Sequence, residues 1–141
     1  MAQFRLTNGY VSINGVDLSD HAYSLDISQS REQVEISGFN SGGYKSFLPG
    51  SSDETVTIGF RQDFASSKVH QTLQPLYANS STFVIVIAPN GPSISATNPA
   101  FQGTAALFEY QGLNGEFGDV SNISAVLKSG NPSSPLAWAT A

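Results

Sequence analysis

The stretch that most constrains the fold of this chain is residues 53–88, where the spacing of the apolar residues changes twice. Apolar and polar residues alternate over 54–60, which predicts a strand with one buried face. Over 65–77 the apolar residues recur at helical spacing. The run 82–88 is short and rich in β-branched residues, and it predicts a strand that is buried on both faces. Because no second helical pattern of similar strength occurs, we expect one amphipathic helix on a mainly β body.

The predicted helix has its own start and stop signals. Its apolar stripe is about 120° wide at helical spacing and consists of Ala65, Val69, Leu73, Leu76 and Tyr77. Asp63 or Ser66 can cap the first turn, because either side chain can accept a bond from a backbone N–H group. Pro75 has no N–H group to donate, so we expect the helix to kink or end there.

The first part of the chain predicts a hairpin and two further strands. Asn14 and Gly15 tolerate the positive φ angles of a type I′ turn, so a hairpin is expected within 11–18. Residues 23–28 and 33–37 alternate between apolar and polar, as half-buried strands do. The apolar residues of the first of these strands, which are expected to face the core, are Tyr23, Leu25 and Ile27.

A glycine-rich loop at 38–50 follows, and it carries large apolar side chains. A loop of this length is usually functional or disordered, and its apolar content argues against simple disorder. The remaining segments are expected to be a loop at 89–99, strands at 101–111 and 120–128, and a tail at 130–141 that contains Trp138. Many short strands with turn signals predict a two-sheet β-sandwich or barrel with one flanking helix, in a single domain.

Charge and cysteine content narrow the class of protein. The 141 residues include no cysteine, which excludes disulfides, thiol catalysis and cysteine-ligated zinc and fits a reducing cytoplasm. Charged residues make up 12% of the chain, against about 25% in a typical globular domain. A surface so poor in charge suits a subunit that is buried among partners, or else an extracellular β-protein. The net charge of −5 repels nucleic acid.

No residue pattern predicts catalysis. His21 with Asp17 and Asp20 could form a hard-metal cluster, but three ligands on one short turn are a non-specific signal. The alternative is that these residues serve the turn itself, since Asp side chains bond their own backbone there. His70 is expected on the helix surface. Because no nucleophile elbow and no phosphate-binding loop occur, we expect no enzyme activity, no metal and no cofactor.

The order of several short motifs is more specific than any one of them. The motifs lie at residues 13–21, 47–50, 60–64, 98–99, 103–104 ahead of 109–110, and 118–119. Together, over residues 11–130, they resemble the tail tube proteins (major tail proteins) of long-tailed bacteriophages. The tail at 130–141 matches no part of that pattern.

The resemblance implies a β-sandwich whose copies form hexameric rings that stack into a tube. Strands of neighbouring subunits would close a β-barrel around a lumen, through which DNA is ejected without specific binding. The implied partners are other copies of the chain and further tail proteins, namely the tape measure, terminator and distal tail proteins, and no membrane. The implied location is the virion, after assembly in the host cytoplasm.

Two sets of residues are candidates for assembly surfaces. The resemblance implies that a long loop between two early strands reaches the adjacent ring. The apolar residues of the corresponding loop in this chain are Phe39, Tyr44, Phe47 and Leu48. The alternative is that these side chains fold back on their own sandwich. Polar faces of the early strands would line the lumen or meet outside solvent, and the candidate lumen residues are Ser24, Asp26, Gln33 and Glu35.

Two other functions stay open. A tail terminator or head–tail joining protein would share the fold, and would form closed single rings instead of long tubes. An extracellular β-sandwich would bind glycans or receptors as a monomer and would not assemble.

Overall fold

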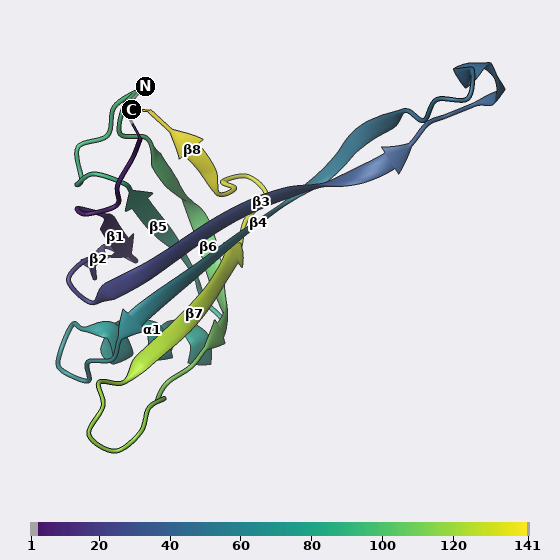
Figure 1. Cartoon of the computed structure of the whole chain (residues 1–141). Coiled ribbons are helices and arrows are strands. Elements are labelled where there is room, and N and C mark those ends of the chain that lie inside the picture. The colour runs from purple at the N-terminus through teal and green to yellow at the C-terminus, as the bar shows by residue number, and fades with distance from the viewer. Residues whose placement is uncertain (1–2, 141) are drawn as a thin grey trace.

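The structure is a computed structural model that describes residues 3–140. Its strands are β1 (Tyr10–Ile13), β2 (Val16–Asp17), β3 (Ala22–Glu35), β4 (Phe47–Arg61), β5 (Thr82–Ala88), β6 (Ala100–Tyr110), β7 (Asn122–Ser129) and β8 (Ala137–Ala139). Its helices are the short 3-10 helix η1 (Phe39–Ser41) and the α-helix α1 (Val69–Ala78). The prediction of a mainly β fold with one flanking α-helix is confirmed (Figure 1).

All the named strands belong to one antiparallel sheet, in the order β2-β1-β5-β6-β7-β4-β3, with β8 paired to β6. The sheet folds over on itself because β6 takes part in both layers. Residues 101–106 of β6 pair with β5, whereas residues 105–110 pair with β7. One layer therefore holds β1 and β5, and the other holds β3, β4 and β7 (Figure 1).

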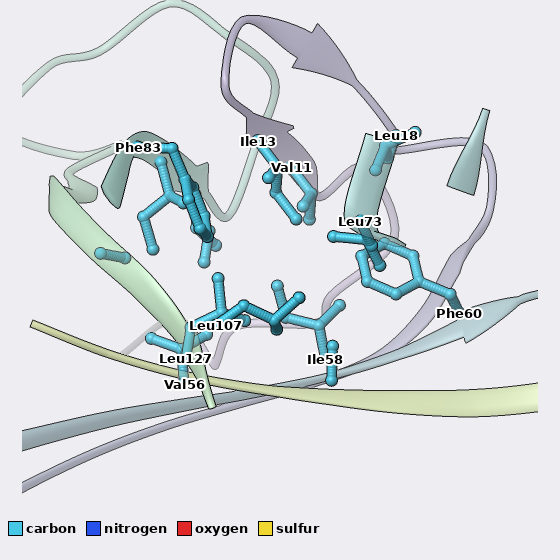
Figure 2. Close-up of a cluster of buried hydrophobic side chains, with 14 of the residues drawn as sticks. Val11, Ile13, Leu18, Val56, Ile58, Phe60, Leu73, Phe83, Leu107 and Leu127 are labelled. Atoms are coloured by element: carbon cyan, nitrogen blue, oxygen red, sulfur yellow. The ribbon is translucent and has the colours of Figure 1, made fainter. Parts of the chain in front are cut away.

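The hydrophobic core fills the space between these layers and extends under α1. In Figure 2 the side chains of Val56, Ile58 and Phe60 leave β4 toward Leu73 and the facing strands. Burial of each such side chain stabilises the fold by about 1.5–3 kcal/mol. The largest fully buried side chains are Phe60, Phe101, Ile13, Leu18, Ile58, Leu73, Ile85, Ile87, Ile123, Leu127, Leu136 and Val56.

Helix α1 is shorter at its start than the sequence predicts. It begins at Val69, and the predicted caps are wrong, because Lys68 occupies the N-cap position without a side-chain cap. Asp63 instead accepts a hydrogen bond from the N–H group of Ala65, in the turn before the helix. The helix continues through Pro75 to Ala78, so the proline does not end it at once.

The N-terminal hairpin forms as predicted, with φ angles of 52° at Asn14 and 81° at Gly15. The next two predicted strands are in fact one continuous strand, β3. The expected core position of Tyr23 is wrong, since 49% of this residue is exposed. The pairing register shifts between Ala22 and Ser24, which leaves Tyr23 outside the regular alternation. Its ring lies against Arg61 instead, 5.0 Å from the guanidinium carbon.

Strand β5 has the predicted bounds but is not buried on both faces. Phe83, Ile85 and Ile87 point into the core, whereas Val84 is 57% exposed. The physical reason is that the second face of β5 is not covered by another layer (Figure 1).

The C-terminal tail is part of the body. Its strand β8 pairs with the start of β6, and Leu136 is buried. The ring of Trp138 meets the ring of Phe101 edge-on, with centroids 5.2 Å apart. Gly103 lets the backbone at Pro135 lie close to β6, because a Cβ atom at position 103 would lie 2.4 Å from the carbonyl oxygen of Pro135.

Candidate assembly surfaces

The β3–β4 hairpin extends well beyond the body of the molecule (Figure 1). We call its outer part, residues 31–52, the arm. Pairing continues along it from Arg31 with Ser52 to Glu35 with Phe47. The arm therefore keeps a regular two-stranded backbone although it is separate from the core.

The arm tip is closed by backbone and side-chain hydrogen bonds. The N–H group of Ile36 donates to the carbonyl of Ser46 at 2.9 Å, and the N–H group of Ser46 donates to the hydroxyl of Ser37 at 2.7 Å. Gly42 and Gly43 have φ angles of 64° and 90°, which only glycine adopts without strain at consecutive positions. The tip is thus a hydrogen-bonded turn, and strand β4 begins at Phe47, inside the loop that the sequence predicts.

Each of the four predicted loop residues is exposed. Phe39 is fully exposed, Tyr44 is 80% exposed, and Phe47 and Leu48 are about half exposed. Val34 and Ile36, which sequence reasoning did not select, add two more exposed apolar side chains to the arm. The structure therefore does not show these residues folded back on their own sandwich. An exposed apolar group of this kind is typical of a surface that is buried in a partner.

A β-bulge lies at the base of the arm. The pairing register shifts between Arg31 and Gln33, so that β4 has one residue more than β3 at this point. Gly50 lies in the bulge, where an added Cβ atom would be 3.0 Å from the Cβ of Glu32. Bulges bend a strand and increase its twist, so this one sets the direction in which the arm leaves the body.

The candidate lumen residues do not share one face of β3. Leu25 and Ile27 pair with core residues of β4, so the alternate positions Ser24 and Asp26 lie on the opposite, exposed face. Gln33 and Glu35 have the parity of Leu25, and they lie on the arm, where there is no core. Local strand geometry therefore separates Ser24 and Asp26 from the other pair.

The exposed face around Asp26 is polar and low in positive charge. Asp26 pairs across the ladder with Thr57, and the next position toward the arm pairs Ser28 with Thr55. The nearby cation, Lys128, binds the carboxylate of Asp53, with Nζ 3.1 Å from Oδ1. This face consequently offers small hydroxyl groups and carboxylate, and its ammonium group is already paired.

His21 forms a carboxylate–imidazole–carboxylate contact. Its Nδ1 lies 2.7 Å from Oδ1 of Asp20, and its Nε2 lies 2.8 Å from Oδ2 of Asp63. The hydrogen bond with Asp20 and then that with Asp63 raise the pKa of His21, against the opposing effect of burial. The pKa of Asp63 is lowered by the N–H group of Ala65 and by His21. Asp17 is not part of this contact, because it binds Ser19.

A second polar group lies beside the first. The hydroxyl of Tyr110 is 2.8 Å from Nδ1 of His70 and accepts a bond from Nε2 of Gln62 at 3.0 Å. Burial raises the pKa of the Tyr110 hydroxyl. These bonds attach α1 and the segment before it to the end of β6, so His70 has a packing role as well as a place on the helix surface.

A second exposed apolar surface, which no sequence pattern indicates, lies in the connection between β6 and β7. We call residues 111–121 the end loop, because it lies at the end of the body away from the arm (Figure 1). Phe117 is fully exposed there, and Leu113 and Val120 are 75% and 60% exposed. Their signal in the sequence is weak, since three apolar residues among glycines and acids follow no period.

Within residues 3–140, no group of three or more His, Asp and Glu side chains is arranged to hold a metal ion. No helix in the same range has the length and hydropathy that a membrane crossing requires. The features that stand out among the described residues are surfaces: the arm, the end loop and the polar face of β3 and β4.

No protein-family model matches the chain, and no curated protein sequence matches it. Solved structures do match. A chain of the virion of a native gene transfer agent particle is 11% identical, with a TM-score of 0.73 over 95% of both chains. A chain of the tail of an empty gene transfer agent particle, refined with C6 symmetry, is 13% identical, with a TM-score of 0.67 over 86% of this chain and 82% of that one.

The SPP1 tail tube is also similar, at 11% identity and a TM-score of 0.63 over 94% of this chain and 74% of that one. The chain therefore has the tail tube fold, as its resemblance to tail tube proteins predicts.

Proposed function

We propose that this chain is a structural virion protein, the subunit of a phage tail tube, which forms stacked hexameric rings around a conduit for DNA ejection. The observation that carries the proposal is the arm: a paired hairpin that projects from a body of tail tube fold and exposes its apolar side chains. Exposure of these apolar side chains to water is unfavourable, and a second copy that covers them would remove them from water. Support for six-fold rings comes from the C6 symmetry of a similar tail.

The sheet supports the same role. β3 is an edge strand along its whole length, and an unpaired edge is a template for pairing with another chain. A ring of subunits would pair these edges and close a barrel. In that barrel Ser24 and Asp26 would line the lumen, where hydroxyls and carboxylates would give DNA phosphates no strong binding site. A structural role, not a catalytic one, is part of this proposal, as is a location in the virion with the other tail proteins as partners.

Electron microscopy of the purified chain tests the proposal. We expect long tubes of stacked rings from the unaltered protein, and soluble folded subunits when residues 36–46 are replaced by a short Gly/Ser turn. Equal circular dichroism spectra and melting temperatures would show that both proteins are folded. Closed single rings would favour a terminator or joining protein. A protein that stays monomeric at high concentration would overturn the proposal.

A further inference from the structure

The arm tip and the end loop both expose large apolar side chains, and they lie at opposite ends of the molecule (Figure 1). Each presents aromatic and aliphatic side chains that touch little of their own chain. Head-to-tail contacts between identical subunits need two such different surfaces, because one copy supplies the first and the next copy supplies the second.

We propose that the end loop receives the arm tip of a second copy, with Lys45 of the arm between Glu116 and Asp119 of the loop. This inference rests on the proposed function, and it names the surface against which the arm is buried. The occupant is the arm tip itself, not another protein.

Charge complementarity identifies the occupant. The arm tip is the segment beyond the last β3–β4 pair, residues 36–46, and Lys45 is its only charged residue, so the tip carries one positive charge among apolar groups. The end loop carries two negative charges, Glu116 and Asp119, and no cation. A surface of matching apolar character and opposite charge fixes the register of docking, and it disfavours contacts between two arms or two end loops.

The end loop has a hollow that fits an ammonium group. A depression of about 450 Å³ is lined by Asn114, Gly115, Glu116, Asp119, Val120 and Asn122. The two acidic residues of the loop, Glu116 and Asp119, are both part of this lining. A lysine side chain brings its methylene groups past Val120 while its charged end meets the two acids.

The loop holds this shape before any partner arrives. The N–H group of Asn114 donates to the hydroxyl of Ser121 at 3.2 Å, and that hydroxyl donates to the carbonyl of Asn114 at 2.6 Å. The side-chain amide of Asn114 donates to the carbonyl of Asn122 at 3.2 Å. Because these hydrogen bonds join the two sides of the loop, the loop loses less conformational freedom when it binds a partner.

Charge exchange tests the pairing. Lys45→Glu places three negative charges together, and we expect it to raise the protein concentration needed for tube assembly by at least about tenfold. The double substitution Glu116→Lys with Asp119→Lys should do the same. When the reversed arm and the reversed loop are combined in one chain, assembly should recover. Arg5→Glu, with an equal change in charge outside both surfaces, is the matched control and should assemble normally.

Cross-linking gives a positive test, because the chain has no cysteine of its own. Oxidised tubes of a Tyr44→Cys, Leu113→Cys variant should show chains linked between copies on a non-reducing gel. A Tyr44→Cys, Ser93→Cys control should show none.

The outcomes separate this inference from the proposed function. If the unaltered chain forms no tubes, the proposed function fails. If Lys45→Glu assembles as the unaltered chain does, or if the reversed pair fails to restore assembly, the end loop is not the receiving surface although the tube stands. Equal cross-linking of the two cysteine pairs would overturn the inference in the same way.

Discussion

The imidazole Nε2 of His21 lies 2.8 Å from Oδ2 of Asp63, so that a hydrogen bond joins the turn before β3 to the turn before α1. The pKa of the His21 imidazole is raised from the ordinary value near 6.5. A raised pKa means that the contact stabilises the fold fully below pH 6.5, and that this stabilisation is lost as the pH rises through the folded-state pKa. The pKa values of Asp20 and Asp63 are lowered. Their contribution to the stability of the fold is therefore lost at acid pH, as the two carboxylates become protonated.

We therefore expect His21→Gln to lower the melting temperature at pH 6 more than at pH 9. Direct NMR titration of the His21 ring should give a pKa above 6.5, which Asp63→Asn lowers. Asp53→Asn removes a carboxylate elsewhere on the surface and is the matched control. A pH-independent effect of His21→Gln would contradict this account.

Leu73→Ala should lower the free energy of unfolding by about 2–5 kcal/mol, because it removes buried methyl groups and leaves a cavity under α1. Leu73 is fully buried between α1 and β4 (Figure 2). Urea unfolding followed by circular dichroism measures the change. Gln74→Ala, one position further along on the exposed side of the helix, should change stability by less than about 0.5 kcal/mol. Equal effects at both positions would show that the helix is not packed as described.

Gly103→Ala should destabilise the C-terminal segment. The φ angle of Gly103 is 153°, and an added methyl group would overlap the carbonyl of Pro135. We expect the 130–140 segment to move away from β6 and Trp138 to leave Phe101. As the only tryptophan, Trp138 reports this directly through a red shift of its fluorescence. Gly38→Ala, where a Cβ atom meets nothing within 4 Å, should leave the emission unchanged.

Asp26→Lys should convert the proposed lumen from a surface that repels DNA into one that binds it. Six copies per ring would place rings of ammonium groups along the passage, and binding should weaken steeply as salt is raised. Co-sedimentation of assembled tubes with short duplex DNA measures this. Asp26→Asn should bind little DNA. If Asp26→Lys tubes bind no more than the unaltered tubes, Asp26 does not line the lumen.

Much of the fold follows from local pattern. The positive φ angles at Asn14 and Gly15 are those that the residue types favour, and β5 has the bounds that its β-branched run predicts. α1 lies where the apolar period changes, although it starts later than the stripe does. These features depend on neighbours in sequence, which a single chain displays.

What could not be predicted depends on contacts between distant residues. The exposure of Tyr23 comes from a register shift against β4. The partner of His21 is Asp63, 42 positions away, which a reading of the local turn could not identify. Residues 47–50 are predicted as part of a loop because alternation stops after residue 37, yet Phe47 and Leu48 pair with Glu35 and Val34. The end loop was passed over because isolated apolar residues in a turn follow no period.

The continuity of β4 from the arm to the core has a mechanical consequence. Antiparallel hydrogen bonds run perpendicular to the strands, so a pull on the arm along its own length would load the β4–β7 bonds together and not one after another. The same strand is bound by β7 over residues 55–61, which carries the load on into the body. In a tube held together by arms, a stretched or bent tail would therefore part at the contacts between subunits, while each subunit stays folded.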